Sequence, residues 1–463
     1  MATKAIPPAA SPYAAGDIDP AFGVHGKLFI PDPSGAINYG LWAVAIFTDP
    51  KETQGRFFVY AHGGSTTAGP HYLVRLFKDG NIDSNFAANG YALIPSGDFE
   101  TLPHPQAVFF HHALFDELGA VTLFGEVVEY HDDDFILLTA LARLKSDGSV
   151  DENFGKDGFK TYKVPKPSGS ILGPALYHER LLGGHTGTVL GSLNIQSASI
   201  RLIDGKITFL AFRYDDFARV HVASYVARIY ATDGRLDESF GDHGLVLITD
   251  GVGATGSVVE GREFTVDAQG GITVAGDLRG KVIIVRYKFD GSLDDQFGEG
   301  GRVLLTPVAG ESTSRGLKLG RDQRVLVLNT VFSPNRRHAE LVVLRRNGTV
   351  DSSFNSGAPL VLERPAPDGF VATGLTEDDG GRIVVSGTKV DASGSSSRGT
   401  LIWRVMPVGT LDGSFGTDGL VTDSRYLMVS AVQIQSPANM VVSTITLTTD
   451  PKEYFQLLYR LIG

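Results

Sequence analysis

The sequence contains no cysteine. Disulfide bridges, zinc–thiolate sites and thiol nucleophiles are therefore excluded. The lack of thiols fits a reducing compartment, and it fits equally an exported bacterial protein that avoids thiol chemistry. Basic residues are also fewer than acidic ones: the sequence has 41 Lys and Arg and 52 Asp and Glu, which gives a net charge of −11. Binding to a phosphate backbone needs clustered basic charge, so we expect no nucleic-acid partner.

Long apolar stretches are missing as well. No segment approaches the roughly eighteen consecutive apolar residues of a membrane-spanning helix. Residues 1–20 hold a single Lys and no continuous apolar region, so we expect no secretory signal peptide. Residues 1–15 are expected to form a flexible tail. The protein is expected to be cytoplasmic as synthesised, and export by a signal-independent route stays open.

Turn-forming residues, in contrast, are abundant and spread along the chain. The sequence has 56 Gly and 22 Pro together with a hydrophobic fraction of 42%. This composition favours a globular protein with many turns between short strands.

An Asp-x-x-Phe pattern recurs seven times, with successive copies 57 to 86 residues apart (294−237 and 237−151). The copies are Asp19 with Phe22, Asp83 with Phe86, Asp151 with Phe154, Asp237 with Phe240, Asp294 with Phe297, Asp351 with Phe354, and Asp412 with Phe415. A Gly lies three residues before each Asp and in several copies follows Asp or Asn, which is typical of tight hairpin turns. The repetition indicates one structural unit used seven times.

Each unit contains four short runs rich in Val, Ile, Leu and Phe. Seven four-stranded units predict an all-β, seven-bladed β-propeller that spans residues 1–463 as a single domain. A linear solenoid is the alternative, but it would need polar capping repeats at both ends. No strand precedes the first motif copy, whereas residues 454–461 form a strand after the last one. We therefore expect residues 27–30 to pair with residues 454–461 and close the seventh blade.

These motifs resemble the delta-sixty repeat family of bacterial proteins, whose units carry a D-G-x-x-D-x-x-F-G-x-x-G core. The resemblance extends from Gly16 to Gly463, with the third repeat lengthened by an insertion at residues 166–197. The departures from the pattern lie at Ala15, Val408, Asn355 and Ala358. The resemblance implies a β-propeller-type repeat and no particular activity.

Residues that are present in every blade are expected to serve the scaffold. The motif Asp is expected to accept backbone N–H groups inside its own turn, and the motif Phe to pack between neighbouring blades. Arginines eight residues before the Asp are expected to pair with it; they are Arg75, Arg143, Arg286 and Arg404. A divalent cation at these Asp residues stays an alternative, although each turn offers one carboxylate and Ca²⁺ takes about six or more oxygens. We predict no other cofactor.

Histidine is concentrated in the first half, where ten of the 12 His precede residue 222. Several lie in loops that a propeller would place on one face of the ring, at residues 62–71, 96–105, 126–134 and 213–221. The candidate binding residues are His62, His71, His104, His131, Asp132, Asp134, Asp215 and His221. Solvated loop polarity is the simpler interpretation, because no fixed metal-ligand spacing is present. In the run His111-His112, one imidazole is expected to face the channel or a neighbouring blade.

No catalytic motif is present. The G-x-G-x-x-G match at residues 251–256 lacks the βαβ unit that would make it a nucleotide-binding loop. We favour a non-enzymatic, monomeric scaffold that presents the loops of blades one to three and the insertion to a protein or glycan ligand. The alternative is a metal-dependent hydrolase or lactonase-like enzyme with its site at the channel mouth. A lectin with a pocket in several blades is disfavoured by the Trp count of 2.

Overall fold

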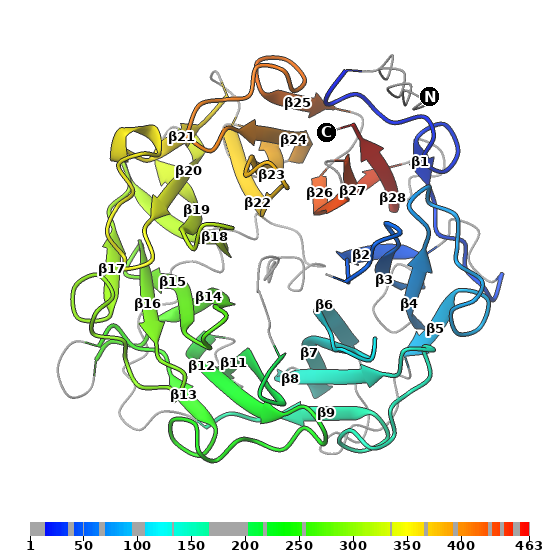
Figure 1. The fold of residues 1–463 in the computed structure, drawn as a ribbon, viewed down its shortest axis with the longest axis horizontal. Helices are drawn as coiled ribbons and strands as arrows, with labels where there is room; N and C mark the ends of the chain where they lie inside the picture. The colour runs from blue at the N-terminus through cyan, green and yellow to red at the C-terminus, as the bar shows by residue number, and fades with distance from the viewer. Residues whose placement is uncertain are drawn as a thin grey trace, which may run out of the picture.

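The computed structural model describes residues 14–35, 41–49, 51–63, 70–94, 107–131, 134–165, 202–215, 220–251, 256–333, 336–364, 369–391, 397–424, 428–435, 439–447 and 454–462. They form seven antiparallel sheets of four strands, arranged like blades around a central axis (Figure 1). The predicted all-β, seven-bladed propeller is therefore confirmed. In the ranges given, no helix is long and apolar enough to cross a membrane.

The strands of each blade follow the chain from the centre outwards in the first three blades. Blade one contains β2 (Trp42–Phe47), β3 (Phe57–His62), β4 (His71–Leu76) and β5 (Tyr91–Ile94). Blade two contains β6 (Ala107–Phe115), β7 (Val121–His131), β8 (Asp134–Leu144) and β9 (Phe159–Tyr162). Blade three contains β10 (Leu202–Ile203), β11 (Lys206–Asp215), β12 (Val220–Tyr230) and β13 (Leu245–Leu247).

Blades four to six have the same order. Blade four contains β14 (Glu260–Val266), β15 (Ile272–Leu278), β16 (Lys281–Tyr287) and β17 (Arg302–Leu305). Blade five contains β18 (Glu311–Leu319), β19 (Val325–Ser333), β20 (Arg336–Leu344) and β21 (Leu360–Leu362), with the short 3₁₀ helix η1 (Asn355–Gly357) in its motif turn. Blade six contains β22 (Gly369–Glu377), β23 (Ile383–Val390), β24 (Ser397–Val405) and β25 (Leu420–Asp423).

The seventh blade joins the two ends of the chain. It contains β26 (Met428–Gln435), β27 (Asn439–Leu447), β28 (Tyr454–Leu461) and the N-terminal strand β1 (Lys27–Leu28). Lys27 pairs with Tyr459 and Leu28 with Leu458, as the sequence predicts. Asp19 adds a side-chain bond by accepting from Arg460 Nε at 2.9 Å, across 441 residues of sequence.

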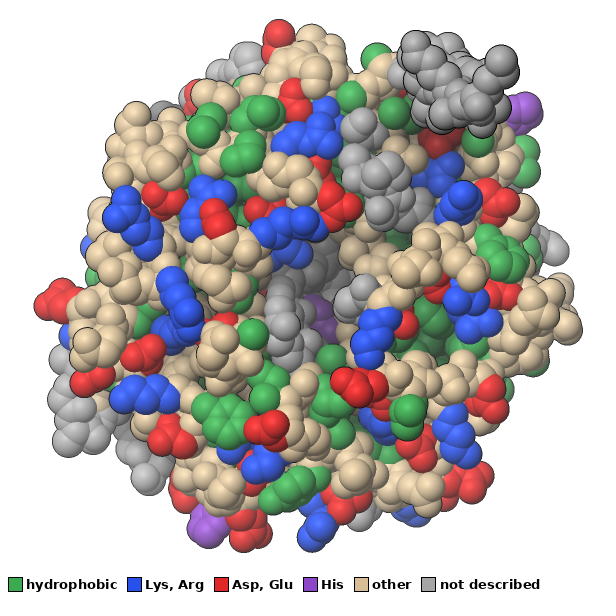
Figure 2. All heavy atoms as spheres, viewed as in Figure 1, with side chains coloured by type: hydrophobic (Ala, Val, Ile, Leu, Met, Phe, Trp, Pro, Cys, Tyr) green, Lys and Arg blue, Asp and Glu red, His purple; other side chains and the backbone are tan. Residues whose placement is uncertain are grey.

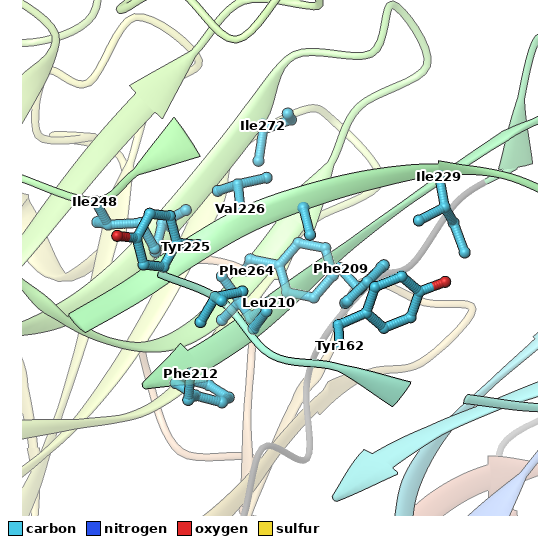
Figure 3. Packing of buried hydrophobic residues seen from close by; sticks show 14 of the residues in the cluster. Tyr162, Phe209, Leu210, Phe212, Tyr225, Val226, Ile229, Ile248, Phe264 and Ile272 are labelled. Atoms are coloured by element: carbon cyan, nitrogen blue, oxygen red, sulfur yellow. The ribbon is translucent and has the colours of Figure 1, made fainter. Parts of the chain in front are cut away.

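The blades pack face to face, and their central strands are apolar on both sides for that reason. Every residue of β3 is buried, and β16 is buried from Val282 onward. Figure 3 shows the core around blade three, where the ring of Phe209 lies 5.3 Å from that of Tyr162 in blade two. Phe264 and Ile272 belong to the same core from blade four. Each sheet thus provides the hydrophobic partner of the next.

The motif Asp holds its own turn and an arginine together. Its Oδ1 accepts the backbone N–H two residues on, at 2.9 Å for Asp19 and 3.0 Å for Asp412. Its Oδ2 accepts from an arginine of the third strand, as in Arg404 Nε to Asp412 at 2.8 Å. The same bond joins Arg75 to Asp83, Arg143 to Asp151, Arg228 to Asp237 and Arg286 to Asp294. The predicted hydrogen bonds of this motif are therefore present, and a cation here would compete with a guanidinium.

The fifth blade departs from this pattern, because Val343 stands where the other third strands carry an arginine. Asp351 still accepts the backbone N–H of Ser353 at 3.0 Å. Its carboxylate lies 3.6 Å from Arg324 Nη1 and 3.7 Å from Arg345 Nε instead. Arginines from other positions thus supply the counter-charge in this turn.

The motif Phe is buried in every copy, with an exposed fraction of at most 1%. The seven side chains are Phe22, Phe86, Phe154, Phe240, Phe297, Phe354 and Phe415. Five of the rings lie against the turn glycine of the following blade: Phe22 against Gly80, Phe86 against Gly148, Phe154 against Gly234, Phe240 against Gly291, and Phe297 against Gly348. The rings of Phe354 and Phe415 lie in cores that join blade five to blade six and blade six to blade seven. A ring so fully covered serves the contact between blades and is out of reach of a ligand.

Phe240 shows how tight this docking is. The turn glycine Gly291 of the next blade lies against its ring, and a methyl group on Gly291 would approach that ring to 2.9 Å, at a φ of +88° that favours glycine. The adjacent Gly241 N–H donates to the carbonyl of Asp290 at 3.1 Å. Equivalent interblade bonds run from Gly23 to Asp79, Ala87 to Asp147, Gly155 to Asp233, Gly298 to Asn347, Asn355 to Val408 and Gly416 to Ala15.

Candidate functional site

The two faces of the ring differ in the connections that they carry. One face, here called the motif face, carries the Asp-x-x-Phe turns between the third and fourth strands of the blades. The opposite face, here called the loop face, carries the connections between the second and third strands. On the loop face these connections range from residues 279–280 to residues 63–70, whereas the motif turns are nearly uniform. The loop-face connections therefore vary more than the Asp-x-x-Phe turns, although the connections between the first and second strands, on the motif face, also range from residues 204–205 to residues 48–56.

Two of the predicted binding residues, His62 and His71, come together at the loop-face end of blade one. They are register partners on β3 and β4, their ring centroids are 5.8 Å apart, and both side chains are buried. His71 Nδ1 lies 2.7 Å from the hydroxyl of Tyr60, which also donates to the carbonyl of Val108 in blade two at 3.1 Å. Burial, aided by the neighbouring His71, lowers the pKa of His62 to about 4. His62 is therefore a neutral imidazole at neutral pH.

The other predicted residues lie at equivalent ends of the next two blades where they are described. His131 is paired with Asp134 at the tip of β7 and β8, and Asp215 and His221 lie on β11 and β12 at the tip of blade three. The structure thus places these four residues, by their backbones, on the loop face. His104, Asp132 and the insertion at residues 166–197 lie outside the described residues. Ligand binding by these candidates stays a prediction.

A feature that the sequence did not predict is a β-bulge in the innermost strand of six blades. In each, one extra residue lies between two paired residues, as Arg262 does between Gly261 and Glu263. The bulged residues are Val44, His111, Arg262, Arg315, Thr373 and Ser430. A bulge breaks the strand's alternation and re-aims a side chain, and bulges are common next to functional sites. The innermost strands surround the central axis of the propeller, so these six residues are called the bulge ring (Figure 1).

The bulge ring combines a repeated backbone with side chains that differ between blades. Charge is concentrated on blades four and five. Arg262 is paired with two carboxylates, Glu260 at 2.8 Å and Asp277 at 3.1 Å. Asp277 also accepts the backbone N–H of Ser314 at 2.8 Å and the hydroxyl of Thr313, so it links blade four to blade five. Burial raises the pKa of the Asp277 carboxyl, although Arg262 opposes the shift.

Arg315, the bulged residue of blade five, differs from Arg262. Its Nε is shielded from solvent and has no hydrogen-bond partner within the part of the chain that the structure describes. Arg262 and Arg337 repel it, whereas Asp277 and Glu263 attract it without bonding to it. Burial, together with Arg262, lowers the pKa of Arg315 to about 10, so it stays charged at neutral pH. Part of the side chain remains accessible to solvent.

Sequence reasoning missed Arg262 and Arg315, because a bulge depends on the register between two strands. A weak signal was present, since glycine adjoins the bulged residue at Gly261, Gly316 and Gly374. Within the described ranges, no three His, Asp or Glu side chains are grouped so that they could hold a metal ion. Figure 2 shows basic and acidic side chains interspersed over the face in view, without a large area of one sign.

Comparison with known proteins gives no family. No family model matches the chain, and no curated protein matches it. Among solved structures, a catalytically inactive virginiamycin B lyase from Staphylococcus aureus with quinupristin is 11% identical, with a TM-score of 0.41 over 94% of this chain and 98% of that one. A protein from Lactobacillus plantarum is 14% identical, with a TM-score of 0.41 over 88% and 96% of the two chains. Prolyl oligopeptidase B from Galerina marginata is 10% identical, with a TM-score of 0.43 over 87% of this chain and 47% of that one. Likenesses this distant do not indicate a shared activity.

Proposed function

We propose that the protein is a non-enzymatic binding scaffold whose loop face takes a protein or glycan ligand. The observation that carries this proposal is the difference between the faces. The motif turns are occupied by internal Asp–Arg pairs and interblade hydrogen bonds, whereas the loop-face connections vary from blade to blade. A rigid ring with variable loops on one side is suited to ligand recognition, because binding residues are commonly carried on loops that a scaffold positions.

Within this proposal the protein is a monomeric member of the delta-sixty repeat family that is cytoplasmic as synthesised, and export by a signal-independent route stays open. Its working surface consists of the loop-face connections of blades one to three and the insertion at residues 166–197. The candidate residues His131, Asp134, Asp215 and His221 belong to that surface by their backbone positions.

The proposal can be tested with loop variants on a folded ring. The full-length protein is applied to a glycan array and, separately, cross-linked in its native host for mass spectrometry. We expect a defined ligand whose binding is lost when residues 167–193 are deleted, while the thermal transition is unchanged. A motif-face variant, Arg235→Gln, is the matched control, because Arg235 is exposed and pairs only locally with Asp233. Unfolding of the deletion variant would show that the insertion is structural and contradict its place in the surface.

The metal-dependent hydrolase is separated from the scaffold by metal analysis. A stoichiometric divalent ion that is removed by a chelator, together with loss of a hydrolytic activity, would favour the enzyme. The scaffold proposal expects neither result.

A further inference from the structure

The turn after β20 contains the dipeptide Asn347-Gly348, which lies on the motif face with the asparagine exposed. In an Asn-Gly dipeptide the backbone nitrogen of the glycine can attack the side-chain amide of the asparagine, and the missing glycine side chain leaves the approach open. The sequence contains one other Asn-Gly dipeptide, Asn89-Gly90, in the motif of blade one, and Asn89 is exposed as well. The two sites therefore share a sequence and differ in their surroundings.

Asn347 differs from Asn89 in the hydrogen bonds of its amide oxygen. The Oδ1 of Asn347 accepts the backbone N–H of Thr349 at 3.1 Å and the Thr349 hydroxyl at 2.8 Å. Donors at this oxygen stabilise the negative charge that it gains when the amide carbon is attacked, as an oxyanion hole does. In the part of the chain that the structure describes, Asn89 has no such pair of donors. The amide of Asn347 is therefore the better electrophile of the two.

The residue equivalent to Asn347 is an aspartate in blades one to four, namely Asp79, Asp147, Asp233 and Asp290. Asp290 accepts the backbone N–H of Ser292 at 2.9 Å and its hydroxyl at 2.7 Å, which are the same two bonds that Asn347 makes. The bonds from Ser292 lower the pKa of the Asp290 carboxyl, so this side chain is charged at neutral pH. A negatively charged aspartate therefore fits the turn of blade five without rearrangement.

We propose that Asn347 is a site of spontaneous deamidation, by which blade five acquires the Asp-Gly turn of blades one to four. The backbone nitrogen of Gly348 gives its proton to hydroxide and forms a bond to the amide carbon of Asn347, whose bond to Nδ2 breaks to release ammonia. Water then opens the resulting cyclic imide to an aspartate. No oxidant or other co-reactant is consumed, and the motif face gains one negative charge. This site does not depend on the proposed role of the loop face.

The attack requires a local opening of the turn, because the Gly348 N–H donates to the carbonyl of Arg345 at 2.9 Å in the closed turn. Exposed turns open at low free energy, so this step slows the reaction without preventing it. The carbonyl of Asn347 accepts from Gly298 N of blade four at 2.7 Å. Opening of the imide at its other carbonyl would insert a carbon atom into the main chain and displace that acceptor. The aspartate product keeps the contact between blades four and five, and the isoaspartate product weakens it.

The test follows both asparagines in one sample of the full-length protein, incubated below its thermal transition at a mildly acidic and at a mildly alkaline pH. Cleavage after glutamate gives residues 341–363 for Asn347 and residues 53–100 for Asn89, and tandem mass spectrometry locates the converted residue. We expect Asn347 to convert faster than Asn89, and faster at the alkaline pH, because the attacking nitrogen must lose a proton. Equal rates at the two sites, or faster conversion of Asn89, would overturn the proposal.

Variants of Thr349 connect the reaction to the two donors. Thr349→Val removes the hydroxyl donor and should slow conversion of Asn347 roughly threefold or more, whereas Asn89 should convert at the wild-type rate. Thr349→Ser restores a hydroxyl, as in Ser149 and Ser292 of other blades, and should restore the rate. Unchanged or faster conversion of Asn347 in Thr349→Val would refute the proposal. Asn347→Asp supplies the product directly and should unfold at the wild-type midpoint, and a lower midpoint would contradict its fit to the turn.

Discussion

At the scale of single residues, an Asp carboxylate organises each motif turn, and in four of the turns it is buried, at Asp83, Asp237, Asp351 and Asp412. Asp237 is the most fully engaged of these, since it accepts from Arg228 Nε at 2.7 Å and from Lys206 Nζ at 2.9 Å. Burial by itself would raise the pKa of Asp237, but the bonds from Ser239, Lys206 and Arg228 outweigh it and lower the pKa. The turn therefore depends on a charged Asp at neutral pH.

Removing the charge of Asp237 should lower the free energy of unfolding. Asp237→Asn keeps the side-chain oxygen of the turn but leaves Arg228 and Lys206 without a counter-charge, so we expect a loss of about 3 kcal/mol in the free energy of unfolding. Asp233→Asn, in the same turn, removes an exposed pair with Arg235 and should cost less than about 1 kcal/mol. Urea denaturation measures both. Equal losses in the two variants would contradict this account.

A second residue-scale effect depends on pH. The pKa of His62 is lowered from 6.5 to about 4, so between these values the unfolded chain binds a proton that the folded protein does not. Stability therefore falls as the pH drops through this window, by on the order of 3 kcal/mol from this group. His62→Gln should lose less stability than the wild type between pH 7 and about pH 4, as followed by urea titrations. Parallel pH profiles of the two proteins would refute the assignment.

At the scale of elements, the turn glycines decide how closely two blades approach. Gly291→Ala places a methyl group 2.7 Å from Val246 and 2.9 Å from Phe240 at a φ of +88°, so the interface must open. Gly300→Ala is the matched control, because Gly300 has a φ of +57° and no atom within 4 Å of the added methyl group. We expect the control to cost about 1 kcal/mol from the left-handed backbone, and Gly291→Ala to cost more than about 2 kcal/mol. Thermal unfolding separates them, and similar midpoints would exclude the steric explanation.

The strands and turns also differ in how far the sequence predicts them. The Asp-x-x-Phe turns repeat local hydrogen bonds, so their spacing predicts seven blades and the pairing of Arg75, Arg143, Arg286 and Arg404. The bulges at Arg262 and Arg315 could not be predicted, because they arise when two strands pair with one residue in excess. The burial of His62 and His71 could not be predicted from the sequence either, because it results from packing between blades one and two.

At the scale of the whole molecule, the N-terminal segment holds the ring closed. Residues 14–30 provide β1, the Asp19 partner of Arg460, and the carbonyl of Ala15 that accepts from Gly416. Removing residues 1–32 should leave the edge of β28 unpaired and lower the unfolding midpoint substantially.

A synthetic peptide of residues 14–32 should restore most of that stability when it is added in trans. A peptide carrying Asp19→Asn and Phe22→Ala is the control, because it keeps β1 and loses the contacts to Arg460 and to the next blade. Circular dichroism during heating gives the midpoints. A truncated protein as stable as the wild type would show that closure contributes little.

The docking of each motif Phe on the following turn also gives the ring a direction. Every blade presents a different surface to its two neighbours, which is the arrangement of a head-to-tail assembly within one chain. Seven such contacts close the ring, so each of the two docking surfaces of every blade is covered by a neighbouring blade. A chain with fewer repeats, such as a truncated product, would expose the motif Phe surface of its last blade and the turn glycine surface of its first blade. Such chains are expected to add to one another end to end, so an intact closing junction also protects the protein against polymerisation.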